Sequence, residues 1–139
     1  MSDTKLIPYL NFSGNTKTAM EFYHGIFGGK LELQTFGKAP GMDVPEGYED
    51  KIIHAVLECE GITIMASETM PGQTVKVGNN VHLSLVGSDQ ATLSKIFAEL
   101  SADGTVSMPL EKQYWGDTFG MCRDKFEILW MINISAAKQ

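Results

Sequence analysis

Two histidines on predicted strands, His54 and His82, are the strongest candidates for proton chemistry in this sequence. Imidazole titrates near neutral pH, so a histidine that faces a cavity can serve as a general base or donate an N–H to an anionic ligand. A histidine on a strand of mixed polarity is also commonly a half-buried, hydrogen-bonded packing residue. Both interpretations stay open for both histidines. His24 is expected on a helix surface, where it would have no such role.

The most distinctive local cluster is Trp115-Gly116-Asp117. At the mouth of a cavity, Trp115 would stack on a flat ligand while Asp117 positions a hydrogen-bond donor. In the structural alternative, Asp117 holds a turn and Trp115 packs across a dimer interface. The sequence favours the structural alternative, because tryptophan is as common at interfaces as at ligand sites.

Nucleophilic chemistry has little support. Cys59 and Cys122 fall on predicted strands and are expected to be small buried hydrophobes, with no Cys–His pair defined by spacing. A serine hydrolase would need a Gly-x-Ser-x-Gly elbow, which the sequence lacks. Met20, Met108 and Met121 are expected to fill gaps in the core.

The elements that must position these residues follow from hydrophobic periodicity. Apolar residues at spacings of three and four predict helices over residues 16–27 and 90–102, the second with Asp89 as its N-cap. Glu60-Gly61 predicts a tight hairpin turn. The segment 37–50, rich in glycine and proline, is either a lid over a binding site or a surface excursion. Strands are predicted over residues 5–12, 31–36, 51–58, 62–67, 81–86, 105–111, 117–122 and 126–134.

The predicted order is strand, helix and three strands, followed by the same series again. An internal repeat of this length indicates two duplicated modules, over about residues 5–68 and 80–135, that pack as one domain spanning residues 1–139. The expected fold class is therefore α+β.

Composition excludes several classes of protein. The chain has 139 residues, of which 43% are hydrophobic and 20% are charged, as in an ordinary globular domain. A formal net charge of −6 disfavours a nucleic-acid partner. No apolar run reaches the length of a membrane span, and the two cysteines lack disulfide-scaffold density, so we expect a reduced, cytoplasmic protein without a membrane partner.

Short motifs distributed over nearly the whole chain resemble the vicinal oxygen chelate superfamily, which groups the glyoxalase, bleomycin resistance and extradiol dioxygenase folds, and within it the PhnB-like branch. The matching residues are Pro8-Tyr-Leu-Asn-Phe12, Gly14-Asn15, Ala19, Phe22-Tyr23, Phe27-Gly28-Gly29, His54-Ala55, Gln113-Tyr-Trp-Gly-Asp117, Phe119-Gly120, Asp124, Phe126 and Trp130. The resemblance implies two βαβββ modules whose sheets curl around a central cavity, often completed in a homodimer.

Metal-dependent members of this superfamily place their ligands on the first, fourth, fifth and eighth strands. The resemblance aligns these positions with Pro8, Met65, His82 and Met131. Proline has no side-chain donor, and thioethers suit soft ions rather than hard divalent ones. One histidine cannot replace the three protein ligands of a usual catalytic metal, and Glu127 is the one nearby carboxylate that would rescue the site. We therefore predict no metal and no cofactor.

Strand alternation predicts which side chains line the cavity. If Pro8 faces inward, Leu10 and Phe12 do too, and the same reasoning groups His82 with Ser84 and Val86, and Met131 with Leu129 and Asn133. Trp130 then points away, into the core against a helix. The Glu60-Gly61 turn pairs Val56 with Met65 and His54 with Ser67 on one face. The predicted ligand-binding residues are Phe12, His54, Met65, Ser67, His82, Ser84, Trp115 and Met131.

A mostly apolar lining with a few polar groups suits a small organic ligand. The first hypothesis is therefore a metal-free, PhnB-like small-molecule-binding protein. The first alternative is a lyase- or isomerase-type enzyme with His54 or His82 as its base. The second alternative is a dimeric interaction protein without a ligand. Some members of the branch carry a methyltransferase label, but the glycine-rich strand-to-helix turn that a methyl donor usually needs is absent from the sequence.

Overall fold

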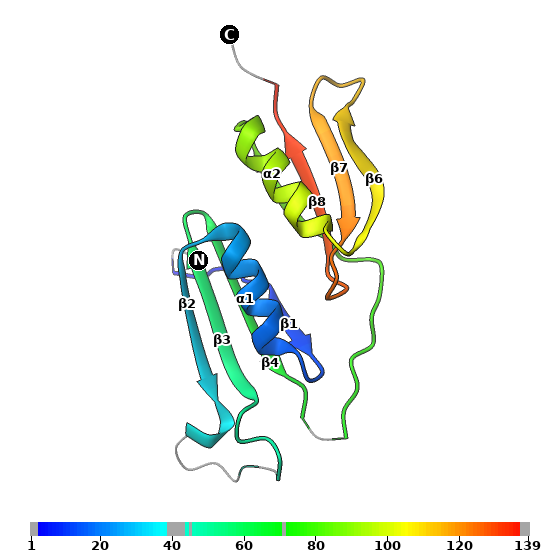
Figure 1. Ribbon diagram of the computed structural model, residues 1–139. Helices are drawn as coiled ribbons and strands as arrows, with labels where there is room; N and C mark the ends of the chain where they lie inside the picture. The colour runs from blue at the N-terminus through cyan, green and yellow to red at the C-terminus, as the bar shows by residue number, and fades with distance from the viewer. Residues whose placement is uncertain (1–2, 39–43, 45, 71, 137–139) are drawn as a thin grey trace. The chain divides into compact units, whose positions relative to one another are not determined.

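Each half of the chain folds into a four-stranded sheet with one helix packed on it (Figure 1). The structure is a computed structural model, and it describes residues 3–38, 44, 46–70 and 72–136. The chain divides after Lys76 into a first and a second compact unit. No helix in the described ranges is long and apolar enough to cross a membrane.

The first unit has the strand order β1-β4-β3-β2, with β1 parallel to β4 and the other pairs antiparallel. The edge strands β1 and β2 leave this sheet open rather than closed into a barrel. Its elements are β1 (Tyr9–Phe12), α1 (Thr16–Phe27), β2 (Lys30–Thr35), a 3₁₀ turn (Phe36–Lys38), β3 (Ile52–Cys59) and β4 (Ile62–Glu68).

The second unit repeats this arrangement in the order β5-β8-β7-β6, with β5 parallel to β8. Its elements are β5 (Leu83–Gly87), α2 (Gln90–Ser101), β6 (Thr105–Lys112), β7 (Thr118–Arg123) and β8 (Leu129–Ile134). The predicted α+β class with two βαβββ modules is therefore confirmed.

Local chemistry explains where the elements begin. Strand β1 starts only at Tyr9, because Pro8 accepts a hydrogen bond from the Met65 N–H at 3.0 Å but has no N–H to donate. Helix α1 has the predicted bounds. Helix α2 begins after Asp89, whose carboxylate accepts from the Thr92 N–H at 3.1 Å as predicted. The predicted 37–50 loop lies partly outside the described residues.

The β3–β4 hairpin has the predicted two-residue turn, which sets the register of the first sheet. Cys59 pairs with Ile62, and Val56 with Met65. Gly61 adopts a φ of +76°, in the left-handed region that glycine enters without a Cβ penalty.

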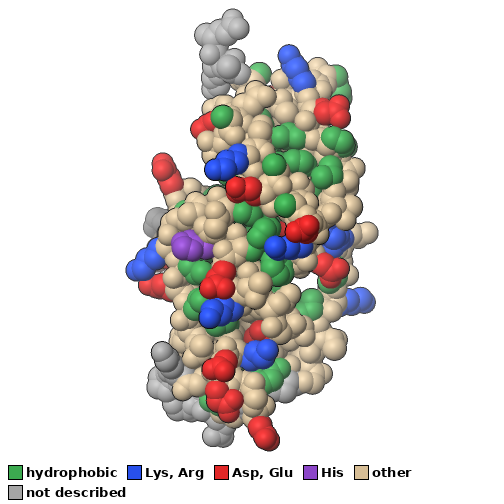
Figure 2. All heavy atoms as spheres, in the orientation of Figure 1, with side chains coloured by type: hydrophobic (Ala, Val, Ile, Leu, Met, Phe, Trp, Pro, Cys, Tyr) green, Lys and Arg blue, Asp and Glu red, His purple; other side chains and the backbone are tan. Residues whose placement is uncertain are grey.

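The core of each unit lies between its helix and its sheet. In the first unit the fully buried side chains include Met20 and Tyr23 of α1 and Leu57 of β3. In the second unit, Leu100 of α2 and Trp130 of β8 are fully buried in the core, as predicted for Trp130. The opposite side of each sheet, which we call the open face, carries the more exposed side chains. On the side of the units shown in Figure 2, acidic and basic side chains are scattered rather than gathered by sign.

Candidate ligand-binding site

The open face of the first sheet carries two parallel rows of side chains. One row runs Glu32, Val56, Met65 and Tyr9, each paired with the next across the strands. The second row contains Gln34 paired with His54, and Ser67 paired with Asn11. The register of Ala55 with Ala66 places His54 beside Ser67, which joins the two halves of this polar row.

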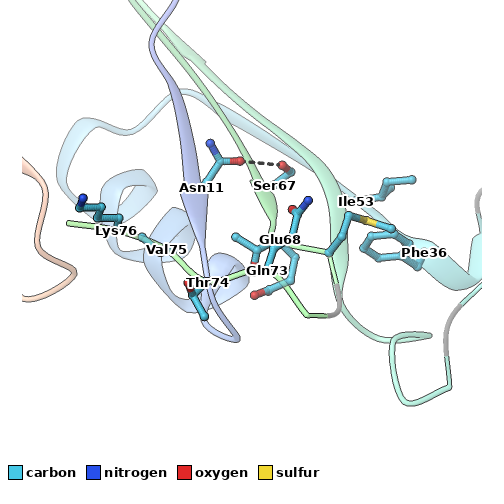
Figure 3. Close-up of a pocket in the computed structure, with 11 residues that line it drawn as sticks. Asn11, Phe36, Ile53, Ser67, Glu68, Gln73, Thr74, Val75 and Lys76 are labelled. Atoms are coloured by element: carbon cyan, nitrogen blue, oxygen red, sulfur yellow. Dashed lines mark hydrogen bonds between the residues drawn. The ribbon is translucent and has the colours of Figure 1, made fainter. Parts of the chain in front are cut away.

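Two hydrogen bonds connect polar side chains on this face. The Tyr9 hydroxyl lies 3.1 Å from His54 Nδ1, and the two rings are 5.8 Å apart at a tilt of 31°. The Ser67 hydroxyl donates to Asn11 Oδ1 at 3.4 Å, as the dashed line in Figure 3 marks. These bonds join two side chains of β1 to one of β3 and one of β4.

Asn11 and Ser67 also line a groove of about 710 Å³, a volume typical of ligand pockets. Phe36 and Ile53 lie on another side, and the chain that follows β4 completes the wall (Figure 3). The residues from that chain are Thr69, Met70, Gln73, Thr74, Val75 and Lys76. The lining thus mixes apolar side chains with neutral amides and hydroxyls.

Ile53 contributes to the groove because the β2–β3 ladder is irregular there. Gln34 pairs with His54 but Thr35 pairs with Ile52, so Ile53 is the extra residue of a β-bulge. A bulge changes the direction of a side chain relative to simple alternation. Sequence reasoning missed Ile53 for this reason, and the polar segment after β4 has no periodicity that would have indicated its role.

Glu68 lines the groove, but its oxygens are engaged by the start of α1. Its side chain is buried, and its two oxygens accept hydrogen bonds from the Gly14 N–H and, at 3.0 Å, from the Thr16 hydroxyl. Asn15, at the N-cap position, makes no side-chain capping bond. Glu68 therefore attaches the turn before α1 and the first residue of that helix to the end of β4.

The first-strand register differs by one residue from the sequence-based expectation. Leu10 and Phe12 are buried on the helix-covered face, whereas Tyr9 and Asn11 are exposed on the open face. Because successive side chains alternate, Pro8 belongs with Leu10 rather than with Tyr9. The prediction that Phe12 lines a cavity is therefore wrong. The open face, where Pro8 and Phe12 were predicted to lie, carries Tyr9 and Asn11 instead.

The structure brings the predicted residues His54, Met65 and Ser67 together on the first sheet. Ser84 and Met131 are paired on the open face of the second sheet. His82 lies just before β5 and is half-buried. Whether any of these side chains binds a ligand stays a prediction.

The open face of the second sheet is largely apolar. Met131, Met121 and Met108 form a row across β8, β7 and β6. Met108 is 40% exposed and Met121 half-buried, so the prediction that both fill the core is wrong. Met20 is fully buried, as predicted.

Trp115 and Asp117 lie in the turn between β6 and β7. The Trp115 ring packs edge-on against two other rings, with a centroid separation of 5.1 Å to Tyr114 and 6.1 Å to Phe119. The Asp117 carboxylate accepts from Asn133 Nδ2 at 2.9 Å and from the Ala136 N–H at 3.1 Å. These two bonds, the Asn133 amide first, lower the pKa of Asp117 below its ordinary value, and they attach the turn to β8.

The chain belongs to the Glyoxalase/Bleomycin resistance protein/Dioxygenase superfamily, whose family model matches residues 6–132. Protein YjdN of Escherichia coli (strain K12) is 32% identical over 143 aligned positions, which cover 93% of this chain and 94% of YjdN. The crystal structure of protein PA1353 from Pseudomonas aeruginosa is 34% identical and superposes with a TM-score of 0.87, covering 97% of this chain and 100% of that one.

A Bacillus cereus structure described as "putative 3-demethylubiquinone-9 3-methyltransferase, PhnB protein" has the same fold. Its TM-score is 0.75 at 23% identity, with 95% of this chain and 100% of that chain covered.

The donor set of this chain does not fit the divalent metal of metal-dependent superfamily members. Among the described residues, no three His, Cys, Asp or Glu side chains gather. The four aligned positions contribute the thioethers of Met65 and Met131 and the single imidazole of His82, while Pro8 uses its carbonyl in the β1–β4 ladder. Thioethers are poor ligands for hard divalent ions, and the phenol of Tyr9 is hydrogen-bonded to His54.

Proposed function

We propose that this protein is a metal-free, small-molecule-binding member of its superfamily and that its ligand occupies the groove beside Asn11 and Ser67. The observation that carries the proposal is the composition of that groove. Its apolar residues, such as Phe36 and Ile53, would bury a hydrophobic body, and Asn11, Ser67 and Gln73 offer neutral polar groups that orient it.

A thermal-shift screen of small organic molecules, run with a chelator present, tests this proposal. A ligand that binds the folded chain stabilises it by RT ln(1 + L/Kd), where L is the free ligand concentration, and so raises the unfolding temperature as that concentration increases. Ser67→Leu should fill part of the groove and abolish the shift. Ser107→Leu, the same change at an exposed position of β6 in the second unit, should leave it unchanged. A screen without stabilising compounds, or equal shifts in both variants, would count against the proposal.

The hydrogen bond between Tyr9 and His54 favours a second candidate, a proton-transferring enzyme of the lyase or isomerase type. His54 would accept a proton at Nε2 in the tautomer that has its own proton on Nδ1, where it would donate to the Tyr9 oxygen. This candidate requires that His54→Gln abolishes turnover of a substrate while the unfolding temperature is retained.

We further propose that the protein acts as a homodimer, with the aromatic pair of the β6–β7 turn at the contact. Tyr114 is 96% exposed and Trp115 is 49% exposed, and aromatic residues are enriched at interfaces. Sedimentation equilibrium should show a dimer for the wild type and a monomer when both are replaced by serine. Val81→Ser, at another exposed apolar position, is the control. An unchanged mass in the double variant would place the contact elsewhere.

A further inference from the structure

We infer that the polar row of the first sheet presents N–H donors to the groove's ligand, which therefore carries an acceptor oxygen as a carboxylate or a ketone. The inference rests on the proposed function and identifies the class of molecule that the site recognises. The two hydrogen bonds on this face use acceptor atoms of Asn11 and His54 and leave N–H donors of the same side chains available.

The first bond uses one of the two acceptor positions of the Asn11 carbonyl oxygen. A serine hydroxyl has a single proton, and that of Ser67 is directed at Asn11 Oδ1 at 3.4 Å. The two Asn11 Nδ2 protons have no hydrogen-bond acceptor among the described residues, and Figure 3 shows this nitrogen directed away from Ser67. The amide of an exposed, groove-lining residue is thus left as a donor.

The second bond occupies an acceptor of His54. A neutral imidazole has one protonated and one unprotonated nitrogen. The Tyr9 phenol is a good donor, so at 3.1 Å it favours the tautomer with an unprotonated Nδ1 and a proton on Nε2. No hydrogen bond joins Nε2 to a described residue, and the described part of the chain has no buried side-chain polar atom without a partner. In this tautomer Nε2–H is an accessible donor on the open face, beside the groove-lining residue Ser67; the second candidate function requires the opposite tautomer, with Nε2 as a base.

The charges near this row are compatible with an anionic oxygen. Glu32, on β2 like Gln34 of this row, is paired with Lys30 at 3.0 Å. Glu68, the carboxylate in the groove lining, already accepts hydrogen bonds at the start of α1. Lys76 adds a positive charge to the lining. An incoming carboxylate thus meets N–H groups and an ammonium, whereas an incoming ammonium would be repelled by Lys76 and would find only neutral hydroxyl and amide oxygens as acceptors.

Benzoate, acetophenone and benzylamine share one aromatic ring and differ in their polar group, so they form a matched set of probes. Titrations of the ¹⁵N-labelled full chain, monitored by NMR, should give binding to the groove in the order benzoate, acetophenone, benzylamine. We expect benzoate to bind at least about tenfold more tightly than benzylamine, because N–H donors bind a carboxylate by charge-assisted hydrogen bonds that an ammonium cannot accept. The Asn11 side-chain NH₂ signals should shift with benzoate.

Asn11→Asp replaces the two donors by an acceptor of the same shape and should reverse the order of benzoate and benzylamine. Gln90→Glu adds the same charge at the start of α2 in the second unit and should leave the order unchanged. Tyr9→Phe keeps the aromatic ring and removes the hydroxyl. It should weaken benzoate binding severalfold and alter the ¹⁵N shifts of the His54 ring, which report the tautomer.

The outcomes separate this inference from the proposed function. Benzylamine binding as tightly as benzoate would overturn the donor assignment and leave a binding groove in place. An unchanged order of affinities in Asn11→Asp would do the same. If none of the three probes binds, the donor inference fails, and the thermal-shift screen decides independently whether the groove binds other molecules.

Discussion

The indole Nε1–H of Trp130 donates a hydrogen bond of 2.8 Å to Asp124 Oδ2, with both side chains buried. The other carboxylate oxygen accepts from the N–H groups of Phe126 at 2.8 Å and Ile128 at 3.1 Å. One carboxylate therefore shapes the β7–β8 turn and joins it to the core of the second unit. Asp124, Phe126 and Trp130 are among the residues through which the sequence resembles its superfamily, and here they have a structural role.

Asp124→Asn should lower the free energy of unfolding by about 2–4 kcal/mol, since an amide group faces three N–H donors where a carboxylate accepted all of them. Urea denaturation measures the loss. Asp103→Asn is the matched control: Asp103 has a φ of +60°, which asparagine tolerates, so its change should stay within about 0.5 kcal/mol. Equal stability of the two variants would contradict the structural role of Asp124.

Burial, with a smaller contribution from the charge of Asp124, raises the pKa of the Cys122 thiol to about 11 from an ordinary value of 9.0. The folded chain therefore keeps the thiol proton between these two pKa values, where the unfolded chain releases it. Stability should fall as pH rises from 9 to 11, and the contribution of Cys122 is fully present only below that range. Denaturant midpoints of wild type and Cys122→Ala across this range measure it.

The wild type should show the steeper decline, because alanine removes the titrating group while the lysines remain. Absolute stabilities are not compared, since alanine also leaves a small cavity. Parallel curves for the two proteins would mean that the Cys122 thiol ionises equally easily in the folded and unfolded states.

Asp89 gives a separate test of helix capping in the second unit. Its carboxylate accepts from the Thr92 N–H at 3.1 Å and from the Thr92 hydroxyl at 2.8 Å. Asp89→Ala should reduce the free energy of unfolding by about 1 kcal/mol, whereas Asp89→Asn should retain most of the cap, because asparagine is an equally good N-cap residue. Equal losses in the alanine and asparagine variants would show that charge rather than capping is responsible.

Sequence periodicity was sufficient to predict the helices and the order of elements along the chain, and the hairpin turn fixed part of the open face. Helix α1 has an apolar stripe and a glycine stop, and the Glu60-Gly61 turn placed His54, Met65 and Ser67 correctly. These features are local, so neighbouring residues along the chain determine them. The open-face positions of Ser84 and Met131 followed from the resemblance to the superfamily, which set the face of these strands, and from alternation along them.

The errors occurred where a non-local interaction determines the outcome. The face on which Phe12 lies depends on which residue of β1 pairs with Met65, and the structure pairs Tyr9 with it. The position of Ile53 depends on a bulge, and the groove depends on how the non-periodic chain after β4 returns past Asn11. A single sequence carries no periodic signal for any of these features, since each depends on pairing between distant segments.

Variants of Glu68 test whether this groove-lining side chain supports α1 without contacting the ligand. Its two oxygens accept from Gly14 and Thr16, so Glu68→Gln must direct an amide NH₂ at one of them. The Thr16 hydroxyl can rotate to accept, which limits the expected loss of unfolding free energy to about 1–2 kcal/mol, whereas Glu68→Ala leaves both donors unpartnered and should cost about 3 kcal/mol or more.

Benzoate affinity should change less than about twofold in Glu68→Gln, because the oxygens that are altered face the start of α1 rather than the ligand. Urea denaturation and the NMR titration measure the two effects on the same samples. A loss of stability without a change in affinity assigns Glu68 to the support of α1. A tenfold gain in benzoate affinity would instead mean that wild-type Glu68 repels the anion, and hence that its charge faces the groove.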